Sequence, residues 1–119
     1  NKNFPKYLNI VIKGSTVLSP KKVFKLVKKI ETQIGRKITK KNYPRICDID
    51  ILDYNKKSIS LNIDDNNLTI PHPRMHCRNF VLLPLFEVDK NWFHPIKKVK
   101  ISRLLSNINN NNLRNVKIL

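Results

Sequence analysis

The sequence predicts an α+β fold, in which a mainly antiparallel sheet is covered by helices. Three observations lead to this class: two stretches rich in β-branched residues, a long amphipathic helix between them, and polar turn residues after the second stretch. The chain has 119 residues, 40% of them apolar, so one modest core is expected. No boundary or internal repeat divides the chain, and we expect a single domain over residues 1–119.

The first third predicts a strand followed by a helix. Residues 7–17 alternate with β-branched side chains, as a half-buried strand does. Ser19 and Pro20 suit a helix N-cap and the first helical position. Apolar residues then recur every three or four positions over residues 23–34, and Gly35 is placed to end this helix.

The middle of the chain predicts a second strand and a hairpin. Residues 36–44 carry four basic side chains without apolar periodicity, so a mobile, positively charged loop is expected. Residues 46–54 are expected to form the second strand, and residues 55–57 can turn it back onto a partner strand at residues 58–63. The stretch 64–67 is polar turn material.

The last part of the chain is expected to be mostly helical. Prolines on both sides of His72 restrain an extended segment over residues 71–73. Residues 80–88 suit either a short helix or an extended core segment, and periodicity cannot separate the two at this length. Residues 101–108 predict a final short helix that frays into the asparagine run 109–112.

Charge is the most conspicuous bulk property. A net charge of +16 attracts polyanions, so a basic nucleic-acid-binding module without catalysis is an alternative function. The lysines are spread along the chain, however, and no aromatic residues alternate with them as in a base-stacking surface. No apolar run approaches the roughly 20 residues that cross a bilayer, and the two cysteines form no CxxC pair. A cytoplasmic protein with no membrane partner is expected.

Asp48 and Asp50 are the strongest candidates for a metal site. Residues two apart on a strand point to the same face, so these carboxylates project together while Ile49 and Ile51 enter the core. Adjacent carboxylates repel unless a cation lies between them, and magnesium binds one or two carboxylates together with phosphate oxygens and water. A solvent-facing strand edge with ordinary alternation is the alternative.

A second group of candidates follows at residues 68–80. The rigid Pro-His-Pro can direct His72 at a phosphate, and Arg78 can hold phosphate oxygens in its planar fork. The alternative for His72 is a turn histidine that caps a backbone group. A zinc site made of His72, His76 and Cys77 lacks one ligand and matches no standard spacing.

Three blocks of the sequence carry a resemblance to a known family. They span residues 41–52 (KNYPRICDIDIL), 69–75 (TIPHPRM) and 78–85 (RNFVLLPL), in order and at the expected separations. The stretches 7–9 and 30–36 upstream look similar as well. Together they resemble 6-hydroxymethyl-7,8-dihydropterin pyrophosphokinase over nearly the whole chain.

The resemblance implies an enzyme of folate biosynthesis with a ferredoxin-like α+β sandwich. Such a transferase moves the terminal diphosphate of ATP onto the hydroxymethyl oxygen of the pterin and releases AMP. It implies small-molecule substrates, a monomer, and no nucleic-acid partner. The chemistry of the residues agrees, because phosphoryl-group transfer needs positioning and charge neutralisation more than a protein nucleophile.

Roles follow by resemblance for individual residues. Asp48 and Asp50 would hold two magnesium ions that bridge the ATP phosphates and the attacking hydroxyl, and the catalytic set would also include Arg36 and Arg45. The ATP-binding set comprises Glu31, Arg36, Ile51, Leu68, Thr69, His72 and Arg78. The pterin-binding set comprises Tyr7, Asn9 and Phe80. Alternatives stay open for three of these: Phe80 as plain core, Tyr7 as a strand-end aromatic, and Glu31 as a helix-surface partner of Lys28.

The chain also departs from the family pattern. Tyr43 stands where a small residue usually precedes Pro-Arg, and Asn42 where many members carry a tryptophan that closes over the ligands. The basic loop is one residue short, so its second ligand among residues 37–41 is not assigned. Nothing matches the family's first strand and helix, and we expect a domain incomplete at its N-terminus and weakly active or poorly folded in these 119 residues alone.

Overall fold

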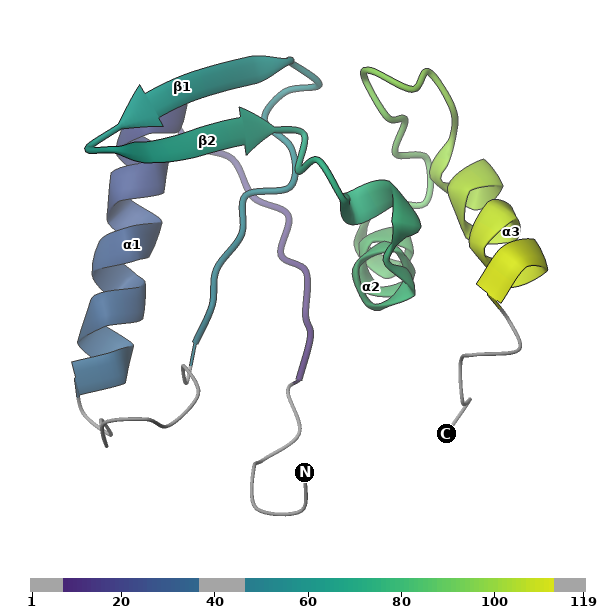
Figure 1. The fold of residues 1–119 in the computed structure, drawn as a ribbon, viewed down its shortest axis with the longest axis horizontal. Coiled ribbons are helices and arrows are strands. Elements are labelled where there is room, and N and C mark those ends of the chain that lie inside the picture. Colours follow the sequence, from purple (N-terminus) through teal and green to yellow (C-terminus); the bar gives the residue numbers. More distant parts are fainter. Residues whose placement is uncertain (1–7, 37–46, 113–119) are drawn as a thin grey trace.

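The computed structural model describes residues 8–36 and 47–112, without the side chains of residue 36 and residues 109–112. The predicted basic loop at 36–44 therefore lies almost wholly outside the described residues. The described elements, in chain order, are α1 (Pro20–Arg36), β1 (Ile59–Ile63), β2 (Asn66–Ile70), the 3-10 helix η1 (Met75–Cys77), α2 (Asn79–Val88) and α3 (Ile101–Asn112). A two-stranded antiparallel sheet with helices confirms the α+β class (Figure 1).

The first helix, α1, begins as the sequence predicts. The Ser19 hydroxyl accepts a hydrogen bond from the Lys22 backbone N–H at 3.3 Å, and the Ser19 carbonyl accepts one from Val23 at 2.9 Å. Pro20 occupies the first turn, where its missing N–H costs nothing. The helix continues through Gly35 to Arg36, so the expected stop at Gly35 was wrong by one residue.

The hairpin forms between β1 and β2, and the expected pairing of residues 46–54 with 58–63 was wrong. Ile59 pairs with Ile70 and Ile63 with Asn66. The two residues between the strands, Asp64 and Asp65, both have positive φ, which suits a tight hairpin turn whose twist matches the strands.

Residues 47–53 run extended without joining a strand ladder. The predicted turn after them does form, since the Lys57 N–H bonds to the Tyr54 carbonyl at 3.0 Å. The backbone of this segment is bonded elsewhere: the Leu52 carbonyl accepts from the His72 N–H at 3.0 Å. Residues 47–53 are thus bonded to the segment after β2 and not to β1. β1 pairs with β2 instead.

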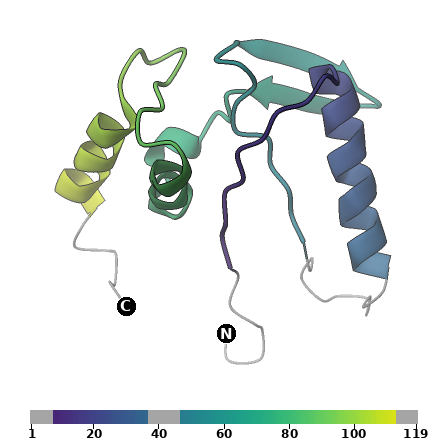
Figure 2. The same cartoon turned by 180° about the vertical axis from the view of Figure 1, so that it is seen from behind.

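The strand expected at residues 7–17 was also wrong over its described part. Residues 8–16 carry no strand assignment, and Leu8, Ile10 and Ile12 are exposed. An alternating pattern fits a pleated backbone, but a strand needs a hydrogen-bonded neighbour about 4.8 Å away. Neither the hairpin nor residues 47–53 provides one in the described part of the chain. Residues 8–16 and residues 47–53 run between α1 and α2 in the projections of Figures 1 and 2.

Two clusters of buried side chains hold the described elements together. Phe24 of α1 packs with Ile63, Leu68 and Ile70 of the hairpin. The other cluster joins η1, α2, α3 and the segment before α3: Met75, Leu82, Leu85, Trp92, Ile101, Leu104 and Ile108. Residues 79–88 thus adopt the helical of the two expected conformations, and the predicted final helix is confirmed. No helix among the described residues is long and apolar enough to span a membrane.

Candidate functional site

Asp48 and Asp50 alternate with half-buried neighbours as the sequence predicts. Both aspartates are exposed, while Ile49 and Ile51 are half-buried, and Ile51 packs against the cluster formed by α1 and the hairpin. The alternation arises in an extended segment without a strand ladder, because period-two geometry belongs to the backbone conformation itself. The two carboxylates therefore lie on the outer side of residues 47–53.

This segment is bonded to the protein on both sides of Asp50. On one side, the Ile49 N–H donates a hydrogen bond to Oε2 of Glu31 on α1 at 2.5 Å. On the other, the Leu52 carbonyl accepts the bond from His72. The two bonds hold the segment at residues 49 and 52, so the backbone on either side of Asp50 is anchored to α1 and to the segment after β2.

His72 follows β2, and one of its ring nitrogens is bonded within its own turn. Its Nδ1 accepts a hydrogen bond from the Arg74 backbone N–H at 3.2 Å, so in the neutral ring the proton is on Nε2. The turn-capping alternative is thus confirmed for Nδ1, and it leaves Nε2–H as a donor. Burial lowers the pKa of His72, the charges of Arg78 and Arg74 lower it further, and Asp50 opposes them.

The electrostatics of His72 show which predicted residues lie near each other. Asp50 and Arg78 both act on its ring, so the structure brings these three together from three separate segments. Arg74 belongs to the same group, and our reasoning from the sequence missed it. The available signal was a basic residue two positions after His72, at the end of the same proline-restrained segment.

Arg78 and Phe80 form the edge of this region at the start of α2. The Arg78 guanidinium lies 5.5 Å from the centroid of the Phe80 ring, within the range of a cation–π contact. Phe80 is 47% exposed, so the alternative that it is plain core was wrong. An exposed aromatic ring next to a cation can stack on a flat, electron-poor or polar heterocycle.

The Glu31 side chain is more buried than that of a helix-surface residue, and both of its carboxylate oxygens have partners. Its side chain is 8% exposed, and its Oε1 lies 3.2 Å from Nζ of Lys28. The expected Lys28 pairing is therefore present, but the surface position was wrong. The bond from Ile49 was not predicted, since nothing in the sequence states which backbone donor faces α1.

The remaining predicted residues are dispersed or not described. Thr69 is exposed on β2, whereas the side chains of Leu68 and Ile51 are in or against the hairpin cluster. Asn9 is exposed on the extended segment 8–16. Tyr7, Arg45 and the side chain of Arg36 lie outside the described residues, as do residues 37–41.

The side chains available as metal ligands indicate which kind of metal ion this site could bind. Among the described residues, no three His, Cys, Asp or Glu side chains converge as a metal site built from protein ligands alone would require. Two exposed carboxylates suit an ion that takes its other ligands from water and phosphate, which is how magnesium binds in nucleotide-dependent enzymes.

The family model and the relatives that match this chain point to the same family. The family model described as 7,8-dihydro-6-hydroxymethylpterin-pyrophosphokinase matches residues 2–90. A "folic acid synthesis protein FOL1" of Dictyostelium discoideum is 40% identical over 111 residues, which are 92% of this chain and 16% of that protein. The 2-amino-4-hydroxy-6-hydroxymethyldihydropteridine pyrophosphokinase of Aquifex aeolicus is 40% identical over 90 residues (76% of this chain, 54% of that one). The protein of the same name from Bacillus subtilis is 39% identical over 82 residues (69% and 47%). The chain thus spans about half the length of the latter two relatives.

Proposed function

Because the chain belongs to the 7,8-dihydro-6-hydroxymethylpterin-pyrophosphokinase family, we propose that it serves folate biosynthesis by moving diphosphate from ATP to a pterin. The acceptor is the hydroxymethyl group of 6-hydroxymethyl-7,8-dihydropterin, and the other product is AMP. The observation that carries this proposal is the pair of exposed carboxylates at Asp48 and Asp50, together with His72, whose ring feels the charges of both Asp50 and Arg78. Carboxylates for a metal and cationic or N–H donors for phosphate are the groups that diphosphate transfer needs.

Asp48 and Asp50 would hold two magnesium ions between them and the ATP phosphates. Bound magnesium would neutralise phosphate charge and lower the pKa of the attacking hydroxyl. The protein's own task is then geometric: Glu31 and His72, through Ile49 and Leu52, keep the two carboxylates on one side of an extended backbone. The rate depends on this placement, because a displacement of about 1 Å can cost on the order of a hundredfold.

The ATP phosphates would be bound by donors that surround Asp50. Nε2–H of His72 and the guanidinium of Arg78 supply two, and Arg36 and Arg45 would complete the set in the catalytic role expected from the family pattern. Leu68, Thr69 and Ile51 would lie beside the nucleotide, and Thr69 is the exposed one of the three. Glu31 would act on ATP indirectly, since both of its oxygens already have partners.

The pterin would occupy the region next to Phe80. Its flat ring would stack on the exposed face of Phe80, with Tyr7 as a second wall and Asn9 donating and accepting hydrogen bonds at the polar edge. Stacking on a rigid aromatic ring costs little conformational entropy and suits a planar heterocycle. The hydroxymethyl group would then face Asp48 and Asp50.

The finer features of the protein are proposals as well. A ferredoxin-like sandwich would pair the β1–β2 hairpin with further strands, and residues 8–16 and 47–53, which belong to no described helix or strand, are the segments that would supply them. We propose one pyrophosphokinase domain over residues 1–119, a monomer, in the cytoplasm. No feature of the described residues favours the nucleic-acid-binding alternative.

The test is AMP formation by the full gene product. The protein is incubated with ATP, magnesium and 6-hydroxymethyl-7,8-dihydropterin, and nucleotides are separated by chromatography. AMP and the pterin diphosphate are expected in equal amounts, with no AMP when the pterin or magnesium is omitted. Tight binding of DNA without AMP formation would contradict the proposal and support the alternative.

A further inference from the structure

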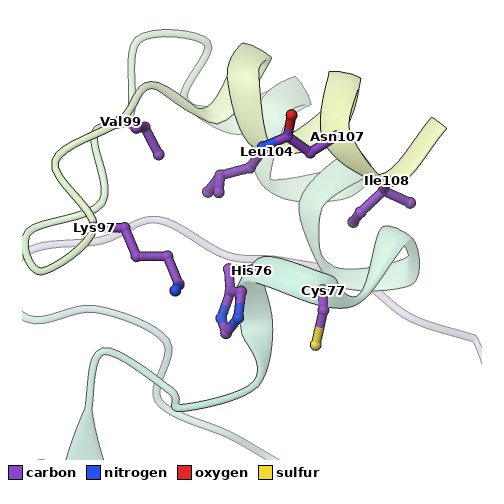
Figure 3. A pocket seen from close by; sticks show the side chains of 7 residues that line it. All are labelled: His76, Cys77, Lys97, Val99, Leu104, Asn107 and Ile108. Carbon is purple, nitrogen blue, oxygen red and sulfur yellow. The ribbon is translucent and has the colours of Figure 1, made fainter. Parts of the chain in front are cut away.

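An open cavity of about 540 Å³ lies between η1, α3 and the segment that precedes α3 (Figure 3). This size falls within the usual range of small-molecule sites. Its lining residues come from three segments that are far apart in the sequence: His76, Cys77, Lys97, Val99, Leu104, Asn107 and Ile108. None of them belongs to the proposed ATP, pterin or metal sites.

The position of Lys97 in this cavity is fixed by a buried histidine. His94 is only 4% exposed, and its Nδ1 accepts hydrogen bonds from the backbone N–H groups of Ile96 at 3.2 Å and Lys97 at 3.0 Å. The His94 carbonyl accepts a further bond from Lys98, and the His94 N–H donates to Val99, each at 2.9 Å. A turn bonded in this way presents the Lys97 side chain from a rigid backbone, into the cavity (Figure 3).

His76 on η1 lies on the opposite side of the cavity, and the Lys97 side chain points toward it (Figure 3). The two groups are electrostatically coupled: burial lowers the pKa of His76, and the charge of Lys97 lowers it further. The His94 ring meets the His76 ring edge-on, with centroids 6.2 Å apart. The cavity thus places the Lys97 amine beside an imidazole whose pKa is lowered.

The rest of the lining divides into one polar group and an apolar wall. Asn107 provides an amide, while Val99, Leu104 and Ile108 provide the wall, and Leu104 and Ile108 are themselves anchored in the buried cluster. Among the described residues that line the cavity there is no carboxylate, so the charge of Lys97 has no internal partner there. Such a site favours a ligand with one negative charge and an apolar body.

We propose that this cavity binds a small organic carboxylate, with its carboxylate group between Lys97 and His76 and its apolar part against Val99, Leu104 and Ile108. The site is separate from the proposed catalytic residues, and its occupancy does not depend on ATP or magnesium. Binding of a carboxylate at this cavity can therefore be tested whether or not the proposed diphosphate transfer is correct.

Benzoate is a suitable probe, and benzamide is its uncharged counterpart of the same shape. Both are titrated into the full gene product while NMR records the His76 ring and the methyl groups of Leu104 and Ile108. Benzoate is expected to shift these signals saturably. Benzamide is expected to bind at least about tenfold more weakly, because a charge-assisted bond to Lys97 contributes more than a neutral one.

Two lysine variants locate the site. Lys97→Met removes the ammonium from the cavity, whereas Lys98→Met removes the same group from the next residue, which does not line it. Lys97→Met is expected to weaken benzoate binding at least about tenfold, and Lys98→Met less than about twofold. Equal losses in both variants would show only general attraction to a basic protein and would overturn the proposal.

The pKa of His76 gives a second measurement that does not depend on affinity. Lys97 and His94 act on this ring, and a bound carboxylate adds a negative charge beside it. Benzoate is therefore expected to raise the His76 pKa in the wild type and in Lys98→Met, but not in Lys97→Met. An unchanged His76 pKa at saturating benzoate, or benzamide binding as tightly as benzoate, would contradict the proposal.

Discussion

The Glu31 carboxylate on α1 accepts a hydrogen bond from the backbone N–H of Ile49, the residue between Asp48 and Asp50. This bond joins the amphipathic helix to the segment that carries the proposed metal ligands. Ile49 has no strand ladder to satisfy its N–H, so the carboxylate takes the place of a neighbouring strand. Glu31 thereby connects helix packing to the geometry of the candidate site.

Removing this carboxylate should affect both stability and activity. In Glu31→Ala the Ile49 N–H loses its partner and Lys28 its counter-ion, and we expect about 1–3 kcal/mol less free energy of unfolding. Glu31→Gln retains an acceptor oxygen and should lose less. Urea unfolding measures the first effect, and kcat for AMP formation should fall with it. Gln33→Ala, on the exposed side of the same helix, is the matched control; an equal loss there would refute a specific role for Glu31.

His72 should matter for ATP more than for the pterin. Its Nδ1 is occupied by the Arg74 N–H, so only Nε2–H is placed to donate to a phosphate oxygen. His72→Ala is expected to raise KM for ATP about tenfold, which corresponds to one hydrogen bond to a charged group. KM for the pterin should stay within about twofold. The opposite pattern, with only the pterin KM raised, would place His72 in a different subsite.

Phe80 should contribute to pterin binding with little effect on stability. Its ring is about half exposed and holds few core contacts, so Phe80→Ala should leave the melting temperature almost unchanged. Loss of stacking should raise KM for the pterin about tenfold. Leu83→Ala removes a similarly exposed apolar side chain of α2 and is the control. A melting temperature that drops sharply in Phe80→Ala alone would indicate a structural role instead.

Stability should decrease as the pH falls below neutrality. Burial lowers the pKa of His94, the charges of His76 and Lys97 lower it further, and Asp53 opposes them. The pKa values of His72 and His76 are lowered as well. With folded pKa values below the unfolded value of 6.5, the unfolded chain binds more protons. Stability is then full above pH 6.5 and is lost as the pH falls from there toward the folded pKa values.

Urea unfolding between pH 8 and pH 5.5 measures this dependence. Each histidine contributes at most about 1.4 kcal/mol per pH unit to the slope. His94→Gln removes one such group and should flatten the slope, whatever its effect on stability at pH 8. A free energy of unfolding that is constant or rises as the pH falls would contradict the assignment.

The sequence predicts well those elements whose signals are local. The N-cap at Ser19, the apolar spacing of α1 and the periodicity of α3 each depend on residues within a few turns, and the structure confirms them. At residues 80–88 the apolar run is too short for periodicity to separate a helix from an extended segment, and packing on both η1 and α3 decides for the helix.

Strand pairing was predicted poorly because it depends on distant partners. Residues 47–53 have the composition of a strand, but Glu31 and His72 occupy two of their backbone groups. The hairpin instead forms around Asp64 and Asp65, whose positive φ values no pattern of apolar residues reveals. For the candidate site, the outward direction of Asp48 and Asp50 was predictable, since it depends only on period two. The bond from Ile49 to Glu31 was not, because no local pattern states which backbone donor faces α1.

The most direct test of the account is the magnesium dependence of AMP formation in three aspartate variants of the full gene product. Asp48→Asn and Asp50→Asn keep the side-chain shape but remove the charge that binds the metal, while Asp65→Asn does the same in the hairpin turn. We expect the first two to lower kcat by on the order of a hundredfold or more and to need more magnesium for half-maximal rate. Asp65→Asn should behave as the wild type. Wild-type rates and magnesium dependence in Asp48→Asn and Asp50→Asn would contradict the central claim that these two carboxylates hold the metal.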